Sequence, residues 1–296
     1  MNLSVKNVSK TYTTKKVVDN ISFDLNKPGI FGFLGTNGAG KTTSIRMILG
    51  IIKKDSGEIL WNCKPINRKN VNFGYMPEER GLYPKVTIYN QLMYFSKLKG
   101  IDTKKADKSI RHWLKKLDME QYTDMHAEKL SKGNQQKIQF ILAVMNDPEL
   151  IILDEPFSGL DPVNTQQLKQ IVLELVNDKK YIIMSSHQMS QIEEFCSDIL
   201  ILNKGKTVLQ GNLKEIKDSY AANKLIIITK ENIERYLKEA EFNKYTNNNN
   251  VYIIELSNKS NGNKLLELLV KNNIEIIKYE EQKPSLHDIF VEKVGK

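Results

Sequence analysis

The sequence lacks the features that would direct a protein into or across a membrane. Its 296 residues contain no run approaching the ~18 consecutive apolar residues needed to span a bilayer. The opening residues, from Met1 to Asn7, carry no apolar secretion segment. We therefore expect the protein to be made and kept in the cytosol.

Cysteine is also scarce. The only two cysteines, Cys63 and Cys196, lie far apart, form no C-x-x-C pair and have no histidine cluster beside them. Two free thiols are favoured over a disulfide or a metal site.

Long blocks of like charge are absent, although the net charge is +9 and the pI is 9.2. A net positive charge of this size is typical of proteins that bind nucleic acid, so that function has to be considered. The lysines are scattered, however, and the densest basic stretch runs from Lys97 to Lys116. A solvated helix face is the favoured interpretation, and the alternative is a surface close to anionic lipid or to a partner that tolerates basic charge.

The most informative stretch that is present matches the phosphate-loop pattern G-x-x-x-x-G-K-[ST]. It comprises Gly35, Thr36, Asn37, Gly38, Ala39, Gly40, Lys41 and Thr42. Glycines let the backbone turn its N–H groups onto anionic oxygens. Lys41 would place a charge on the β- and γ-phosphates, and the Thr42 hydroxyl would ligate Mg²⁺. The apolar run 30–34 predicts a strand before the loop, and the spacing from Thr43 predicts a helix after it.

The order of apolar patterns predicts an α/β domain that ends near residue 216. The fully apolar runs 150–153 and 181–184 suit strands buried on both faces of a parallel sheet. Residues 164–177 supply the crossover helix between them, and 87–147 has helical spacing.

The tail, residues 222–296, has a different pattern. Its strands and helices nearly form a βαββαβ unit, which predicts a small ferredoxin-like α+β module. Asn247 to Asn250 would form a hairpin turn or loop, and Ser285 and Asp288 would cap a last short helix.

A second signature follows the strand 150–153, where Asp154 and Glu155 stand side by side. At the ligand-binding edge of an α/β sheet, Asp154 would hold Mg²⁺ through water and Glu155 would polarise the water that attacks the γ-phosphate. An isolated pair of this kind would be interpreted as an acidic helix cap. After a phosphate loop the functional interpretation is strongly favoured.

Four further pieces complete the pattern: Leu130 to Gln136, Ser158 to Asp161, His187 after the next buried strand, and Tyr12 upstream. The set resembles the nucleotide-binding subunit of an ATP-binding cassette (ABC) transporter, from residue 1 to about 216. The resemblance implies a P-loop NTPase cassette of α/β class. Its parts would be a RecA-like parallel sheet core, an antiparallel β subdomain and an α-helical subdomain at about 86–148.

The resemblance also implies roles for these residues. Ser131 and Gly133, with Asn134, would contact the γ-phosphate of ATP held by a second subunit. His187 would contact the same phosphate and hold Glu155 and the water in line. Tyr12 would stack on adenine, and Asp161 would couple the two sites. The nucleotide contacts would also include Thr43.

The family logic implies a dimer, since the chain carries one cassette and two head-to-tail copies complete two ATP sites. The second copy would be identical or a homologue. The partners implied are a separate membrane permease and no nucleic acid, and the cofactors are ATP and Mg²⁺. The ATPase would lie peripherally on the inner face of the cell membrane.

Two positions depart from the family pattern. Lys132 stands where a glycine is usual in the signature segment, and it adds a cation near the interface. Glu78 stands where a glutamine normally reaches toward Mg²⁺. We expect Glu78 to remain the metal-facing residue, with Glu79 as the alternative register.

The stretch from Pro77 to Tyr83, the Leu130 segment and the tail together resemble one branch, the bacterial exporter-type ATPases. These pair with an ABC-2-type permease and include sodium-exporter-like systems. Val86 to Lys99 is the expected docking surface for the permease, although an ordinary amphipathic core helix explains the same pattern. The transported substrate is not encoded here, and the tail would serve dimerisation, regulation or stability.

Two rival functions are disfavoured. A soluble ABC ATPase that acts on nucleic acid or the ribosome usually has two cassettes or a long coiled coil, and this chain has neither. A nucleotide-binding regulator without turnover is disfavoured by Glu155, because an inactive cassette would be expected to have lost that carboxylate.

Overall fold

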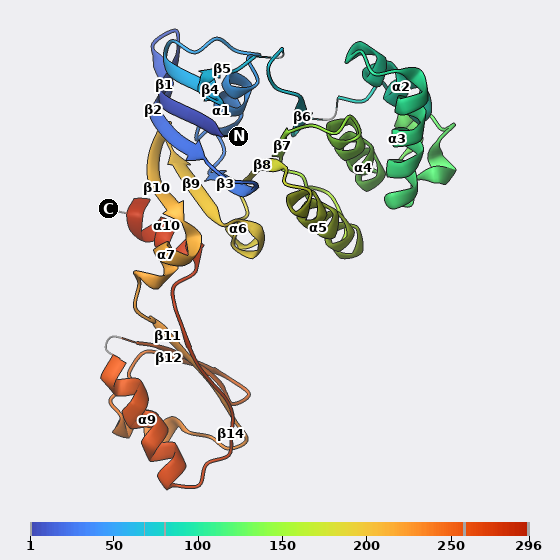
Figure 1. The fold of residues 1–296 in the computed structure, drawn as a ribbon. Helices are drawn as coiled ribbons and strands as arrows, with labels where there is room; N and C mark the ends of the chain where they lie inside the picture. Colours follow the sequence, from blue (N-terminus) through green and yellow to red (C-terminus); the bar gives the residue numbers. More distant parts are fainter. Residues whose placement is uncertain (1, 68, 80, 257–258, 295–296) are drawn as a thin grey trace. The chain divides into compact units, whose positions relative to one another are not determined.

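The structure is a computed structural model that describes residues 2–67, 69–79, 81–256 and 259–294 (Figure 1). The chain divides into two compact units, Met1–Gly211 and Asn212–Lys296. The second unit begins earlier than the expected residue 222 because helix α7 (Leu213–Asp218) belongs to it. Asn212 caps this helix, and Asp218 pairs with Lys283 at 2.6 Å. Among the described residues, no helix is long and apolar enough to cross a bilayer.

A six-stranded sheet in the order β10-β9-β3-β8-β7-β6 forms the centre of the first unit. Its strands are β3 (Gly29–Gly35), β6 (Phe73–Met76), β7 (Leu150–Asp154), β8 (Tyr181–Ser186), β9 (Asp198–Asn203) and β10 (Lys206–Asn212). The pairs β9-β3, β3-β8, β8-β7 and β7-β6 are parallel. All residues of β7 and β8 are buried. The apolar runs at 150–153 and 181–184 therefore form the doubly covered parallel strands that the sequence predicts.

An antiparallel sheet in the order β2-β1-β4-β5 forms a second layer of this unit (Figure 1). It comprises β1 (Leu3–Tyr12), β2 (Lys15–Leu25), β4 (Ser56–Trp61) and β5 (Lys64–Pro65). Its inner residues share one hydrophobic core with the parallel sheet, and the rings of Phe23 and Phe31 stack at 4.9 Å between centroids. β1 and β2 run longer than their apolar residues suggest, because bulges near Asn7 let the strands continue through polar positions.

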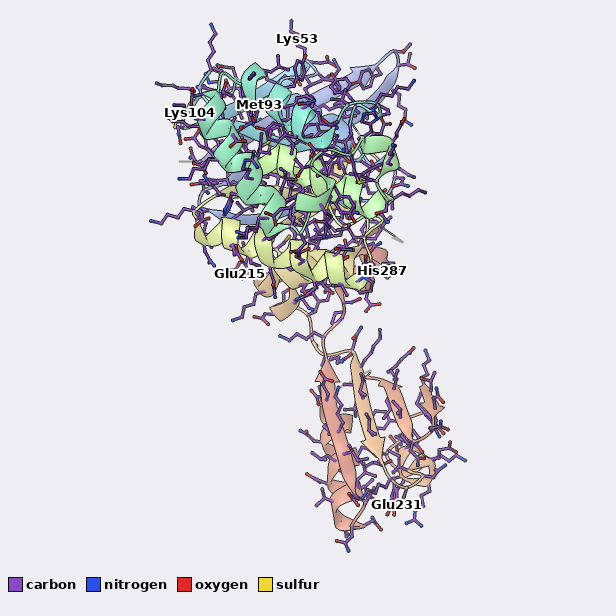
Figure 2. The ribbon with its side chains drawn as sticks, turned by 90° about the vertical axis from the view of Figure 1, so that its right-hand side faces the viewer. Lys53, Met93, Lys104, Glu215, Glu231 and His287 are labelled. Carbon is purple, nitrogen blue, oxygen red and sulfur yellow. The ribbon has the colours of Figure 1, made fainter. Side chains whose placement is uncertain are left out.

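Helices complete the first unit. α1 (Lys41–Ile48) follows the phosphate loop, α5 (Pro162–Asn177) joins β7 to β8, and α6 (Met189–Phe195) follows β8. The predicted helical subdomain contains α2 (Ile88–Leu98), α3 (Thr103–Lys116) and α4 (Lys132–Val144), with short 3₁₀ turns at Glu120–Tyr122 and Ala127–Lys129. Met93 of α2 and Lys104 of α3 mark two of these helices in Figure 2. The three expected parts of the cassette are confirmed.

The second unit has the predicted ferredoxin-like order of elements. After α7 come β11 (Lys224–Thr229), α8 (Glu234–Glu239), β12 (Tyr245–Asn248), β13 (Val251–Glu255), α9 (Lys259–Lys271), β14 (Ile276–Gln282) and α10 (Leu286–Val294). The four strands form one antiparallel sheet in the order β12-β13-β11-β14, and a separate core lies beneath them. Strand β12 was not predicted because its sequence is polar and shows no alternation of apolar residues. A two-residue turn, in which Asn249 and Asn250 both have left-handed backbone angles, joins it to β13.

Both cysteines are free, as expected: Cys63 is exposed, and burial raises the pKa of the Cys196 thiol.

Candidate functional site

The phosphate loop connects the end of β3 to the start of α1. Gly40 takes the N-cap position with a φ of 105°, and Gly35 has a φ of 152°. A Cβ at Gly40 would lie 2.7 Å from the Val17 carbonyl oxygen, and one at Gly35 would lie 2.5 Å from that of Leu202. The loop conformation therefore requires glycine at both positions, for its backbone angles and for space.

Lys41 is the buried cation of this loop, with 8% of its surface exposed. Its Nζ donates to the carbonyl oxygen of Gly35 at 2.7 Å. Thr36, Asn37 and Gly38 are exposed. Their exposed backbone and the uncapped N-terminus of α1 offer N–H groups that suit a phosphate.

Asp154 ends β7 and is 1% exposed. Its Oδ1 accepts a hydrogen bond from the Ser185 hydroxyl, while Oδ2 is buried with no partner among the described residues. Burial raises the pKa of Asp154, and the charges of Glu78 and Glu155 raise it further against the lowering effects of Ser185 and Lys41. A buried carboxylate oxygen without a hydrogen-bond partner is a fitting ligand for a cation or its water.

Glu155 follows directly and is also buried. Its Oε1 accepts from the backbone N–H of His187 at 2.8 Å and lies 2.9 Å from the His187 Nδ1. The Ser186 hydroxyl lies 3.5 Å from Oε2. The structure therefore brings together the carboxylate and the histidine that the sequence predicts to act on one water.

Glu78 lies on the loop after β6 and is exposed. Its charge contributes to the raised pKa values of Asp154 and of Tyr75, the latter raised chiefly by burial. Glu79 instead has its backbone carbonyl oxygen bound by the Gln139 Nε2 at 3.1 Å. Of the two glutamates, only Glu78 contributes to the raised pKa of Asp154. Arg80 in the same stretch lies outside the described residues.

The predicted signature residues lie at the start of α4. Ser131 is the N-cap, and its Oγ accepts from the N–H of Asn134 at 3.2 Å. A Cβ at Gly133 would lie 3.6 Å from the Gly159 carbonyl oxygen, so this segment packs on the loop after Glu155. Lys132 is exposed beside Ser131.

Asp161 and Tyr12 lie apart from the carboxylates in local environments of their own. Asp161 is the N-cap of α5, and hydrogen bonds from Asn164 lower its pKa. Tyr12 ends β1 with its ring exposed, and the Lys10 Nζ lies 5.5 Å from the ring centroid. The exposed ring leaves a face on which a planar base would stack.

Two polar residues at the site were not predicted from sequence. Ser185 holds Asp154, and the Gln136 Nε2 donates to the carbonyl oxygens of Glu155 and Pro156, both at 3.1 Å. The sequence features that could have indicated them are a serine at the end of a predicted buried strand and a glutamine on the buried face of a predicted helix.

A cavity of about 910 Å³ lies between the segment after α1, β6 and the helical subdomain. Its lining includes Ile51, Phe73, Tyr75, Phe95, Leu98 and Lys99. Lys99 Nζ donates to the Phe73 carbonyl oxygen at 2.6 Å, and burial lowers the lysine pKa.

No metal-binding cluster of three or more His, Cys, Asp or Glu side chains occurs in the parts of the chain that the structure describes. Among the side chains that the sequence predicts for Mg²⁺, Asp154 and the Thr42 hydroxyl are oxygen donors of the kind that this ion prefers.

Comparison with known proteins agrees with this geometry. The family model for the ABC transporter matches residues 18–158, and the model for the C-terminal domain of DrrA1-3-like ATP-binding proteins matches residues 211–294. The chain is 44% identical to the uncharacterized ABC transporter ATP-binding protein YhaQ of Bacillus subtilis, over 99% of this chain and 98% of that protein. It is 31% identical to the bacitracin transport ATP-binding protein BcrA of Bacillus licheniformis, over 99% and 97%.

A solved structure described as an ATP binding subunit of an ABC transporter matches with a TM-score of 0.68 and 28% identity, covering 74% of this chain and 93% of that one. Together with the phosphate loop and the paired carboxylates, these matches show that the chain belongs to the ABC transporter ATP-binding proteins, ATPases whose turnover is coupled to transport.

Proposed function

We propose that the chain hydrolyses ATP with Mg²⁺ at the Lys41 loop, with Glu155 as the general base. The main support for this proposal is that three groups lie at the carboxyl edge of the parallel sheet, after three adjacent strands. The phosphate loop follows β3, the Asp154–Glu155 pair follows β7, and His187 follows β8, which lies between them. Ligands of open α/β sheets bind outside this edge.

Each group has a distinct role. Lys41 and the loop N–H groups hold the β- and γ-phosphates, and Lys41 exchanges its bond to Gly35 for the phosphate oxygens. Glu155 accepts a proton from the attacking water, while His187 holds the carboxylate in line. Bound Mg²⁺ would neutralise charge on the phosphate oxygens, held by Thr42, by Asp154 through water, and by Glu78 as sensor.

A second copy or a homologous subunit would complete the site. The N-terminus of α4, where Ser131 is exposed and Gly133 and Asn134 are half-buried, suits the γ-phosphate of ATP bound by that partner. Tyr12 would stack on adenine of its own ATP, and Asp161 would lie at the contact between the two subunits.

The membrane partner is proposed to be an exporter permease of the ABC-2 type on a separate chain, with the ATPase on the cytoplasmic side. Two exposed apolar side chains of α2 support a docking surface at Val86 to Lys99. Leu98, which lines the cavity, is 65% exposed, and Tyr94 is 50% exposed. BcrA is named for bacitracin transport and LnrL of Bacillus subtilis, 29% identical, for linearmycin resistance.

The ATPase cassette would end at Gly211, and the residues after it would form an accessory module.

The Glu155→Gln variant tests this proposal in the purified protein. We expect ATP to bind but turnover to fall at least ~100-fold, because general-base catalysis is worth about 10²–10⁴. With hydrolysis blocked, ATP should shift the protein to a dimer in size-exclusion chromatography with light scattering. Adding Ser131→Arg should return it to a monomer. Wild-type turnover by Glu155→Gln would refute the assignment.

A further inference from the structure

The buried glutamine on α4 that binds the Glu155 segment has no role in the hydrolysis proposed above. Gln136 is 3% exposed, and its single Nε2 binds the carbonyl oxygens of Glu155 and Pro156, both at 3.1 Å. A side-chain amide buried against two backbone carbonyls fixes the distance between its helix and that segment.

The segment needs such restraint because Glu155 has a strained backbone. Its φ is 53°, in the left-handed region that residues with a Cβ rarely occupy. Such a conformation persists only where the surroundings enforce it. On one side, the Glu155 N–H donates to the Ser185 carbonyl oxygen at 3.2 Å. On the other side, the Glu155 carbonyl accepts from the Ser158 N–H at 3.2 Å and from Gln136.

The two sides of Glu155 are therefore anchored to different elements. The N–H is held by β8 of the sheet, whereas the carbonyl is held by α4 of the helical subdomain. The direction of the Glu155 side chain depends on both anchors, since the peptide planes on either side set the orientation of its Cα–Cβ bond.

The same helix carries the signature residues at its start and a further anchor one turn beyond Gln136. Gly133 lies against the Gly159 loop, and the Gln139 Nε2 donates to the Glu79 carbonyl oxygen at 3.1 Å. A helix of this length moves as a rigid element, so a shift at its start carries Gln136 with it.

We propose that Gln136 is a positioning residue that transmits the position of the signature segment to the Glu155 carboxylate of the same chain. The signature segment contacts ATP held by the partner, whereas Glu155 acts on ATP held by its own Lys41 loop. Gln136 thereby makes the placement of one general base depend on nucleotide at the other site. The inference rests on the proposed function, because it requires Glu155 to be the base.

The Gln136→Met variant keeps the length of the side chain and removes the amide. We expect its kcat to fall about 10- to 100-fold, the effect of misplacing a catalytic group by a fraction of an ångström to an ångström. The dissociation constant for MgATP should not change, because the Lys41 loop is untouched. Rates are referred to folded protein, measured by thermal melting at the assay temperature.

Gln167→Met is the matched control. The Gln167 Nε2 also bridges two oxygens, Asp118 Oδ2 at 2.8 Å and the Lys116 carbonyl at 3.4 Å, but it joins α5 to the C-terminal end of α3. We expect this variant to keep its kcat and its affinity for MgATP.

The Gln136→Glu variant tests the proposal a second time, through the pH dependence of kcat, in case the Gln136→Met variant does not fold. An ionised carboxylate cannot donate to the two carbonyls, whereas a protonated one donates once. Burial raises the pKa of such a carboxyl, so its kcat relative to wild type should rise between about pH 8 and about pH 6. The same ratio for Gln136→Met should stay flat.

The outcomes separate the two proposals. If Glu155→Gln abolishes turnover but Gln136→Met keeps wild-type kcat, the role of Gln136 is refuted and that of Glu155 stands. A parallel loss of kcat in Gln136→Met and Gln167→Met would show a structural role only and would also refute the inference. Wild-type turnover in Glu155→Gln would instead refute the proposed function. If Gln136→Met fails to fold, a flat pH ratio in Gln136→Glu overturns the inference.

Discussion

We predict that the charge of Asp154 makes the nucleotide-free protein less stable than an uncharged side chain would at the same position. Its carboxylate is almost fully buried, and Oδ2 has no hydrogen-bond partner among the described residues. Its pKa is raised above the ordinary value of 3.8, first by burial and then by the charges of Glu78 and Glu155.

The sign of the pH dependence follows from this elevation. The folded protein binds the Asp154 proton more tightly than the unfolded chain does. The stabilising contribution is fully present below the unfolded pKa of about 3.8 and is lost as pH rises through the higher folded pKa. At neutral pH without a cation, the free energy of unfolding therefore carries a penalty from the buried charge.

Replacing Asp154 by asparagine removes that charge and keeps an acceptor for the Ser185 hydroxyl. In EDTA at neutral pH we expect the free energy of unfolding to rise by about 1 to 2 kcal/mol. This corresponds to an increase in Tm of roughly 2 to 8 °C for a domain of this size. The gain should shrink toward about pH 4, where the wild-type carboxyl is protonated.

Differential scanning fluorimetry across pH, with EDTA or with MgATP, measures these shifts. MgATP should stabilise wild type more than Asp154→Asn, and the variant should lose Mg²⁺-dependent ATP hydrolysis. Ser185→Ala is the opposing control, because it removes the hydrogen bond that lowers the Asp154 pKa and should lower Tm at neutral pH. An asparagine variant that is less stable than wild type at every pH in EDTA would refute the reasoning.

Three further outcomes are expected. Lys41→Ala should abolish ATP binding and turnover together, measured by calorimetric titration and phosphate release, and normal hydrolysis would contradict the site. Gly74→Ala should destabilise the first unit by about 1–3 kcal/mol, because its Cβ would lie 2.1 Å from the Ala143 carbonyl oxygen. Gly81→Ala has no heavy atom within 4 Å and should leave Tm unchanged. Removal of residues 212–296 should leave a cooperative calorimetric transition from the first unit, whose core is its own, and loss of that transition would refute independent folding.

Contiguous features of this protein could be predicted from sequence because their chemistry is local. The phosphate loop is one run of residues, and its glycine backbone angles depend only on neighbouring atoms. Asp154 and Glu155 follow a run whose apolar character alone predicts a buried parallel strand. Helix α5 begins within two residues of its predicted start, since Asp161 and Pro162 form a local N-terminal signal.

The tertiary structure alone decided which distant groups meet. Ser185 reaches Asp154, and Gln136 reaches the Glu155 carbonyl, from segments that no local spacing relates. Strand β12 exists because β13 supplies backbone partners for a polar sequence. The parallel sheet brings loops from several strands to one carboxyl edge, and burial there sets the charge state and orientation of the side chains. The sequence therefore determined which side chains are candidates for catalysis, whereas the fold determined which distant groups hold them.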